Sequence, residues 1–301
     1  GMDSAAITDH GVMYGVIDFY RAAKAAGIRP ILGCEVYVAP GSMYDKENVG
    51  GEDRYYHLVL LAENNTGYSN LMKIVSKGFT EGYYYKPRVD KEVLETYHEG
   101  IIALSACLAG EVAREITRGR YETAKEAALS YEKIFGKGNF FLELQDHGIP
   151  DQQQVNQALL RMSQETGIEL VCTNDVHYTY ADDAKAHDIL LCIQTGKKVN
   201  DEDRMRYEGG QYYVKSPEEM AQLFPYALQA LENTQKIAER CNVEIEFGVT
   251  KLPKYDVPDG YTSWEYLNKL CWEGLEKRYN PVTQDLKDRL TYELSTIKQM
   301  G

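Results

Sequence analysis

The sequence predicts a mixed α/β fold of the β/α-barrel type, and three observations lead to this prediction. Short apolar runs alternate with amphipathic helical stretches up to about residue 180. Each run is bounded by Gly, Pro or charged residues, as expected for strands buried on both faces of a parallel sheet. Residues able to bind a metal recur at the ends of these runs. In a closed β/α barrel the strand ends converge on one mouth, so ligands far apart in sequence would meet there.

Six apolar runs are predicted to be strands. They are AAITDH (5–10), PILGCEVYV (30–38), YYHLVLLA (55–62), GIIALSACL (100–108), FFLELQDH (140–147) and IELVCTNDVH (168–177). Natural barrels close with more strands than six. The first run follows directly on Gly1-Met2-Asp3-Ser4, with no cap or helix before it. We therefore expect a first barrel strand to be missing upstream of this run.

Four helices are predicted between the strands, and each ends at or near a glycine. They occupy residues 15–27, 68–82, 110–136 and 151–167. The third stretch is interrupted at Arg118-Gly119-Arg120. We therefore expect it to form two helices.

The pattern changes after residue 177. Residues 181–193 and 216–242 are predicted to be helical, the second with Ser216 as its N-cap and Pro217 at its first position. A Tyr- and Gly-rich stretch, RYEGGQYYV, is expected to be a hairpin or loop between them. The predicted organisation is a barrel with its helical extension over 1–247, an extended linker over 248–263 and one or two helices over 264–301.

Composition and charge exclude several classes of protein. The 301 residues are 44% hydrophobic, enough for one barrel-sized core and an appendage. No apolar run approaches the ~18 residues that a membrane helix needs, and no signal peptide opens the sequence. The six cysteines form no CxxC pair, which favours reduced thiols and a cytoplasmic location. A net charge of −13 argues against a broad basic nucleic-acid surface. Any contact with DNA would be local or mediated by metal.

The residues at the strand ends form a plausible set of metal ligands. The set comprises His10, Glu35, His57, Cys107, Asp175 and His177. Imidazoles and carboxylates suit several divalent ions, and a thiolate favours zinc over magnesium. Two further residues are placed in a second tier: Asp9, as a partner that orients an imidazole, and His147, as a ligand for metal or phosphate.

A simpler interpretation of each residue alone is structural. An Asp-His pair at a strand end often caps a turn, and a single buried cysteine is more often an inert hydrophobe than a ligand. His98 and His187 lie in polar or helical contexts, and we assign them to the surface or to packing. The tyrosine clusters at 83–86 and 211–214 suit interface packing better than stacking on single-stranded nucleic acid. Lys86-Pro87-Arg88, beside the first cluster, is a weak candidate for contact with phosphate.

Six ordered motifs carry a resemblance to a known family. ITDHG, GCEVYV, HLVLLA, LSACLAGEV, LELQDHG and TNDVHY, in this order and spacing, resemble the PHP (polymerase and histidinol phosphatase) domain of bacterial DNA polymerase III alpha subunits. The likeness covers nearly all of residues 1–250. Residues 251–275 and the closing YELSTIKQMG resemble the segment that leads into the polymerase proper.

The resemblance implies a distorted seven-stranded, TIM-like β/α barrel whose mouth binds two or three metal ions. His10 matches the histidine of the family's T-D-H motif, Glu35 the bridging carboxylate and His57 the next histidine. Cys107 stands where some relatives have histidine. Asp175 and His177 match the closing D-x-H pair. The family's H-x-H motif on strand one would lie upstream of Gly1, so we expect reduced metal occupancy, reduced stability or self-association. Zinc is the favoured metal, with manganese or magnesium as alternatives.

Three functions remain open on this basis. The first is a metal-dependent phosphoesterase module of a replicative polymerase, with 3′–5′ exonuclease proofreading as its reaction. A second is a domain that braces the polymerase and binds replication partners, with a vestigial metal site. The third is a free-standing phosphatase of the histidinol-phosphate type, against which the polymerase-like tail argues. The implied partners are DNA and other polymerase III holoenzyme subunits, with no membrane. Polymerisation itself would reside outside this chain.

Overall fold

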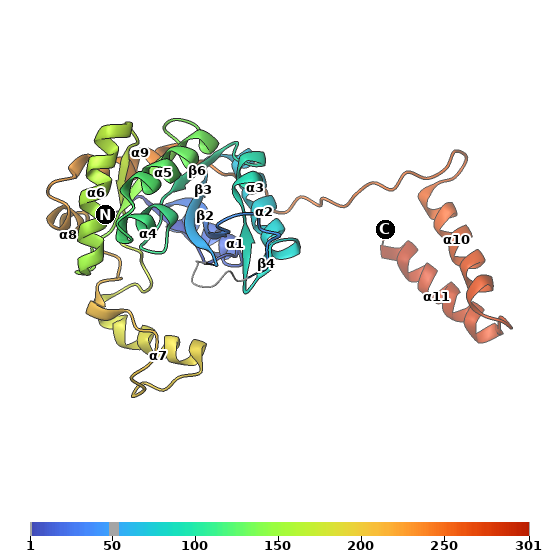
Figure 1. Cartoon of the computed structure of the whole chain (residues 1–301). Coiled ribbons are helices and arrows are strands. Elements are labelled where there is room, and N and C mark those ends of the chain that lie inside the picture. The colour runs from blue at the N-terminus through green and yellow to red at the C-terminus, as the bar shows by residue number, and fades with distance from the viewer. Residues whose placement is uncertain (1, 48–53, 301) are drawn as a thin grey trace. The chain divides into compact units, whose positions relative to one another are not determined.

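The computed structural model describes residues 2–47 and 54–300 (Figure 1). The chain divides into two compact units, Gly1–Ile245 and Glu246–Gly301, and each is described here by itself. The first unit contains every strand and every candidate ligand in the described residues. It therefore carries the site.

The first unit is built on a curled sheet in the order β4-β5-β2-β3-β6-β7-β8, with β1 also paired to β2. The strands are β1 (Ser4–Ile7), β2 (Arg29–Val38), β3 (Tyr56–Ala62), β4 (Tyr83–Tyr84), β5 (Lys86–Val89), β6 (Ile101–Leu104), β7 (Phe140–Leu144) and β8 (Leu170–Cys172). All six predicted strands are present. The sequence did not predict the short β4–β5 hairpin. The mixed α/β, barrel-like fold class is confirmed.

The sheet is mixed rather than wholly parallel, so the expectation of a parallel sheet is wrong for one strand in its centre. β3 runs antiparallel to both β2 and β6, whereas β6, β7 and β8 are parallel. Parallel neighbours need a crossover connection, usually a helix. Residues 39–47 and 54–55, between β2 and β3, contain no helix. His57 therefore lies at the start of its strand, yet at the same end of the sheet as the ends of β2 and β6.

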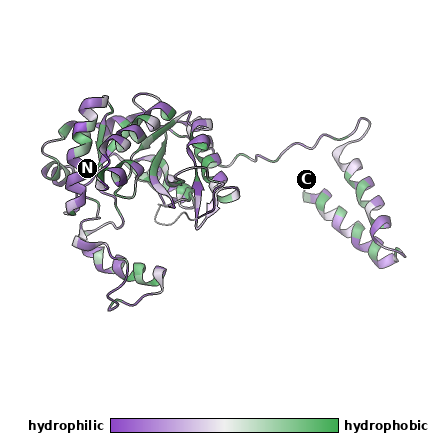
Figure 2. Ribbon diagram, in the orientation of Figure 1, coloured by the Kyte–Doolittle hydropathy of each residue, from purple (hydrophilic) through white to green (hydrophobic). Residues whose placement is uncertain are grey.

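Alternation along the strands separates two cores, one on each face of the sheet. Even-numbered β3 residues such as Leu58 and Leu60 pack under the covering helices in the larger core. Val59 and Leu61 point to the other face and join a smaller inner core. His57 and Glu35 share the parity of this inner face, because side chains alternate with period two. Figure 2 shows hydrophobic residues concentrated on the central strands, with mixed colouring on the helices around them.

Most of the helices lie where the sequence predicts them. They are α1 (Val16–Ala25), α2 (Asn65–Thr80), α3 (Lys91–Thr96), α4 (Glu111–Thr117), α5 (Tyr121–Phe135), α6 (Pro150–Thr166) and α7 (Ala184–Thr195). The predicted break at residues 118–120 is confirmed, since α4 ends at Thr117 and α5 begins at Tyr121. The six-residue α3 was not predicted. Asp90 caps it by accepting a hydrogen bond from Val93 N–H at 3.0 Å.

The stretch predicted as one helix over 216–242 is two helices. α8 spans Pro217–Leu223 and α9 spans Leu228–Arg240. Ser216 is the N-cap of α8, as expected, and forms a capping box with Glu219. Pro225, which lacks a backbone N–H, accounts for the interruption.

Helix α9 connects the two edges of the open sheet. In the described residues β1 and β8 are not paired with each other. Asn233 on α9 donates to Leu170 O on β8, at 2.8 Å. Arg29 at the start of β2 donates to Ala238 O on the same helix, at 3.0 Å. A helix therefore holds together the two sides that strand pairing leaves apart.

The second unit contains two helices, α10 (Ser263–Arg278) and α11 (Gln284–Met300). Thr262 and Glu265 form a capping box at the start of α10. None of the helices in the described part of the chain is long and apolar enough to cross a membrane.

Candidate metal centre

Glu35 is the hub of the site. Its side chain is 7% exposed, and its Oε1 lies 2.6 Å from His10 Nδ1 and 2.9 Å from His57 Nδ1. Glu35 comes from β2, and His57 lies on the neighbouring strand, where it pairs with Tyr37. One carboxylate oxygen thus contacts two imidazoles that are far apart in sequence.

Backbone hydrogen bonds attach the ligand-bearing loops to the strands. Glu35 N donates to Asp9 O at 3.0 Å and Gly11 N donates to Glu35 O at 2.8 Å, so the segment around His10 is fastened along β2. On the other side, His57 N donates to Ala109 O at 3.0 Å, which fastens the turn after Cys107 to β3. The ligands are therefore positioned by the sheet itself.

Cys107 completes a compact donor group with Glu35 and His57. One ligand atom from each of the three lies within 4.8 Å of the others. Cys107 Sγ is 3.6 Å from His57 Nδ1. Around a tetrahedral zinc ion, nitrogen and sulfur ligands at the usual bond lengths would be about 3.5 Å apart. The spacing and the donor types fit zinc.

Asp175 and His177 lie near His10 and Glu35. The His177 ring is 5.8 Å from the His10 ring, measured between centroids. His177 Nδ1 lies 2.7 Å from Asp175 O, so Nδ1–H donates a hydrogen bond to this carbonyl oxygen. The other ring nitrogen, Nε2, then carries the free electron pair. This tautomer leaves Nε2 available to a metal ion. The structure thus brings all six first-tier residues to one mouth.

Burial and neighbouring charges act on the acidic groups of the site. Burial raises the pKa of Glu35, but hydrogen bonds from His10 and His57 outweigh burial and set the pKa at about 2. The bond to Glu35 raises the pKa of His10. Burial, reinforced by Glu35, raises the pKa of Asp175 and of the Cys107 thiol. A divalent cation would relieve this accumulation of charge and deprotonate the thiol, so the residues fit a metal.

The two second-tier residues have partners within the protein. The backbone oxygen of Asp9 accepts from Glu35 N–H, but its carboxylate lies near Gly15, and Glu35 takes the place of Asp9 as partner of the His10 imidazole. His147 is buried, with Nε2 donating to Asn174 O at 3.0 Å and Nδ1 accepting from Gln152 Nε2 at 2.8 Å. Both ring nitrogens of His147 are therefore engaged by the protein.

Sequence reasoning missed an aromatic group against His177. The His177 ring lies 4.5 Å from the Tyr207 ring and 5.4 Å from the His187 ring, between centroids. Tyr212 stacks on His147 at 3.9 Å and contacts Tyr207 at 4.8 Å. His187 was assigned to surface or packing, and the structure places it beside a candidate ligand. No sequence pattern joins residues 177, 187 and 207, because α7 and a loop separate them.

Glu143 is a second residue that was missed. It is fully buried on β7 and accepts hydrogen bonds from Ala106 N–H and from the Thr173 hydroxyl. Burial raises the pKa of Glu143 to about 7. A charged residue in the middle of the apolar run FFLELQDH was the signal that could have identified it. It ties the segments that precede Cys107 and Asp175 to the sheet.

Backbone strain is concentrated beside the site. Among non-glycine residues in 2–47 and 54–300, positive φ occurs at Tyr85 (61°), Ala106 (64°) and Asp175 (42°). Such conformations cost energy and are typical of functional sites. Ala106 precedes a candidate ligand and Asp175 is one. Tyr85 precedes Lys86.

Gly11 is required by its conformation and by a close approach. Its φ is +67°, and a Cβ there would lie 2.6 Å from the Tyr37 ring. We expect Gly11→Ala to lower the free energy of unfolding by about 2 kcal/mol and to displace His10. Urea denaturation and zinc titration measure the two effects. Gly41→Ala, where a Cβ meets nothing within 4 Å, is the control. Equal stability of the two variants would contradict this expectation.

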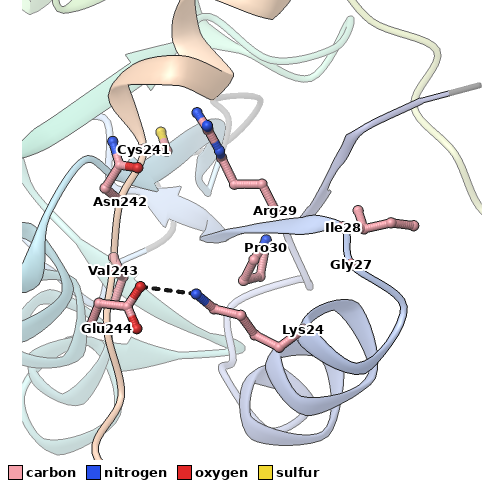
Figure 3. A pocket seen from close by; sticks show the side chains of 9 residues that line it. All are labelled: Lys24, Gly27, Ile28, Arg29, Pro30, Cys241, Asn242, Val243 and Glu244. Atoms are coloured by element: carbon pink, nitrogen blue, oxygen red, sulfur yellow. Dashed lines mark hydrogen bonds and ion pairs between the residues drawn. The ribbon is translucent and has the colours of Figure 1, made fainter.

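A separate pocket of about 290 Å³ lies at the start of β2 (Figure 3). None of the six candidate ligands lines it. The ion pair between Lys24 Nζ and Glu244 Oε1, at 2.9 Å, spans it, and Arg29 donates to Ala238 O. These contacts fasten residues 238–244 to α1 and β2.

Comparisons with known proteins agree with the motifs. The PHP domain family model matches residues 1–147. DNA polymerase III subunit alpha of Borreliella burgdorferi is 47% identical over 302 residues, covering 100% of this chain and 26% of the relative. The subunit of Treponema pallidum is 45% identical, with 100% and 26% covered, and that of Thermus aquaticus 42% identical, with 98% and 25% covered. The chain thus spans about a quarter of the length of these curated relatives.

Proposed function

We propose that the barrel is a metal-dependent phosphoesterase module of a replicative DNA polymerase, because the PHP family model matches residues 1–147 and the whole chain is homologous to DNA polymerase III alpha subunits. Its proposed reaction is 3′–5′ exonuclease cleavage of DNA. The observation that supports the proposal is the convergence of His10, Glu35, His57 and Cys107 with Asp175 and His177 at one end of the sheet.

Two groups of residues are proposed to hold the metal. Glu35, His57 and Cys107 form the compact group, and the thiol favours zinc over manganese or magnesium there. Asp175 and His177 form the second group, with His10 between the two. When bound, such ions lower the pKa of a coordinated water and polarise a phosphodiester oxygen. The chain itself supplies the burial of Glu35 and the fixed tautomer of His177.

The rest of the chain is assigned by the same homology. We propose that Glu246–Gly301 leads into the polymerase region and that nucleotide addition resides in the part of the relatives that this chain does not span. The proposed partners are DNA and other polymerase III holoenzyme subunits, and the proposed location is the cytoplasm. The acidic net charge of −13 is consistent with local rather than broad contact with DNA.

Metal analysis and nuclease assays test the proposal. We expect the purified chain to contain zinc, and His57→Ala and Asp175→Ala each to lower the zinc content and to reduce 3′–5′ cleavage of single-stranded DNA by about a hundredfold or more. His98→Ala is the matched control, because His98 is exposed and its ring bonds the backbone oxygen of Glu95 rather than a candidate ligand. Unchanged cleavage in both site variants would refute the nuclease. Zinc binding without any cleavage would favour the partner-binding domain instead.

A further inference from the structure

The tripeptide Lys86-Pro87-Arg88 lies beside the metal centre, and its two cations have different surroundings. Arg88 is 3% exposed. Its guanidinium donates to backbone oxygens of Met43, Asp45, Arg54 and Gly82. Lys86 is only half-buried, and among the described residues its ammonium has no carboxylate or carbonyl partner. Arg88 is therefore a structural residue, whereas Lys86 keeps its charge available.

The strand register places Lys86 level with the hub of the site. Arg88 on β5 pairs with Tyr37 on β2 in parallel. Lys86 lies two residues earlier on β5, and Glu35 lies two residues earlier on β2. At that level the edge of β2 is occupied by His10, which forms an isolated bridge with Glu35. The side chains of Lys86 and Arg88 share one face of β5, because alternate residues of a strand do.

Contacts with the His10 loop show that Lys86 is close to the candidate ligands. A Cβ on Gly11 would lie 3.1 Å from Pro87 Cγ, so the residue after His10 packs against the residue after Lys86. The Tyr37 ring, which Lys86 approaches, also contacts the His57 ring, with centroids 5.4 Å apart. The ammonium is thus one ring contact away from a candidate ligand.

Ring contacts through Tyr55 and Tyr37 connect His57 to Lys86. The Tyr55 ring is parallel to the His57 ring, with centroids 6.1 Å apart, and meets the Tyr37 ring edge-on at 4.9 Å. Lys86 Nζ lies 5.5 Å from the centroid of the Tyr37 ring. This cation–π contact holds the ammonium without neutralising its charge. The left-handed backbone of Tyr85, φ 61°, turns the chain into β5 just before Lys86.

We propose that Lys86, with the rings of Tyr37 and Tyr55, forms a phosphate-binding subsite at the rim of the metal centre. Its ligand is a phosphodiester group of a single-stranded nucleic acid, next to the one that is cleaved. The site carries the buried carboxylate of Glu35 and the half-buried carboxylate of Asp175, which repel such an anion. A cation without a carboxylate partner at the rim compensates for this repulsion, and a nearby base can stack on the half-buried Tyr55 ring, which the buried Tyr37 ring supports.

This inference rests on the proposed function, and a binding experiment separates the two. The probe is a 5′-fluorescein-labelled oligothymidylate of eight nucleotides, followed by fluorescence anisotropy at low ionic strength with the whole chain, once with zinc and once with chelator. We expect Lys86→Ala to weaken binding about tenfold, as the loss of a charged hydrogen bond does. Lys86→Arg keeps the charge and should bind within about threefold of the parent.

Lys73→Ala is the matched control. Lys73 Nζ lies 5.6 Å from the centroid of the Tyr97 ring, so the variant removes the same kind of cation–π contact from α2. We expect it to bind like the parent. Inorganic phosphate as competitor distinguishes a site for any phosphate, which it displaces at low millimolar concentration, from one that requires the strand. In cleavage assays Lys86→Ala should raise KM with little change in kcat.

Each result decides the proposal. Binding by Lys86→Ala equal to that of the parent overturns the subsite, even if the chain is a zinc nuclease. Absence of any binding by the parent also overturns it. Loss of binding in Lys86→Ala, in a chain that neither binds zinc nor cleaves DNA, leaves the subsite standing and removes the nuclease. If circular dichroism shows that Lys86→Ala is unfolded, Lys86→Gln replaces it, and binding by the Arg variant but not the Gln variant supports the subsite.

Discussion

Glu35→Gln is expected to abolish tight zinc binding, with the affinity falling on the order of a hundredfold or more. Loss of a residue that only orients a ligand costs up to about a hundredfold in metal affinity. Glu35 does more, since its Oε1 contacts both His10 and His57. The amide removes the negative charge at the centre of the group and offers two donors in place of an acceptor on one side. The imidazoles then lose their common partner.

Competition titration with a zinc chelator measures this effect. The matched control is Glu169→Gln, which makes the same chemical change at an exposed position beside β8. Its zinc affinity should equal that of the parent. A Glu35→Gln variant that binds zinc as tightly as the parent would show that Glu35 is not a ligand, and the assignment of the compact group would fail.

The same substitution is expected to change how the stability of the metal-free chain depends on pH. Hydrogen bonds from the imidazoles outweigh burial and lower the pKa of Glu35 from 4.5 to about 2, so its contribution is complete above pH 4.5 and is lost toward pH 2. The bond to Glu35 raises the pKa of His10 above 6.5, so its contribution is complete below pH 6.5 and is lost as the pH rises through the raised value.

The pair therefore stabilises the metal-free chain most between pH 4.5 and 6.5. Thermal unfolding in the presence of chelator, followed across this range, should show a maximum for the parent. Glu35→Gln should flatten it. An identical pH profile for the two proteins would contradict the pairing of Glu35 with His10.

Arg88→Ala is expected to lower the free energy of unfolding by about 3–5 kcal/mol. The side chain is 3% exposed, and its removal leaves a cavity in the sheet. The backbone oxygens of Met43 and Asp45, at 3.2 and 2.6 Å, also lose their donor. A buried acceptor without a partner costs about 1–3 kcal/mol. Arg88→Lys retains the charge but not the fork of donors, so it should recover only part of the loss.

Urea denaturation of Arg88→Ala and Arg161→Ala tests this expectation. Arg161 also lies over a tyrosine ring, 4.3 Å from the centroid of Tyr121, but its side chain is 62% exposed. The change at Arg161 should stay within about 1 kcal/mol of the parent. Equal losses in the two variants would show that the carbonyl contacts of Arg88 contribute nothing. Comparison of Arg88→Ala with Lys86→Ala separates the structural role of Arg88 from the phosphate-binding role proposed for Lys86.

The sequence was sufficient to predict the elements that repeat a simple pattern. Apolar runs bounded by Gly, Pro or charge became strands, and the Arg118–Arg120 interruption ended one helix and began the next. The six candidate ligands were found because they recur near the ends of strands. His57, at the start of its strand, reaches the same end of the sheet as the others because β3 is antiparallel to β2 and β6. Strand length and polarity are local properties, so local patterns are enough to predict them.

Direction and partners are not local properties, so local patterns are not enough to predict them. The run YYHLVLLA does not indicate that β3 is antiparallel to β2, because the direction of a strand depends on the path that the chain takes between β2 and β3. The engagement of both His147 nitrogens depends on Gln152 and Asn174, one on a helix and one after the next strand. His187 comes to lie beside His177 through the placement of α7. Pro225 was a local signal for the break before α9, and its effect was underestimated.

The reversal of β3 also determines where the barrel tolerates growth. The connection from β2 to β3 leaves from the ligand-bearing end of the sheet and returns to it, whereas the connection from β3 to α2 lies at the opposite end. Insertions between β2 and β3 would accumulate over the site and adapt it to new substrates. Insertions after β3 would enlarge the far side without altering the chemistry. Lengthening of the loop before β3 would therefore change function, whereas lengthening of the loop after β3 would leave function unchanged.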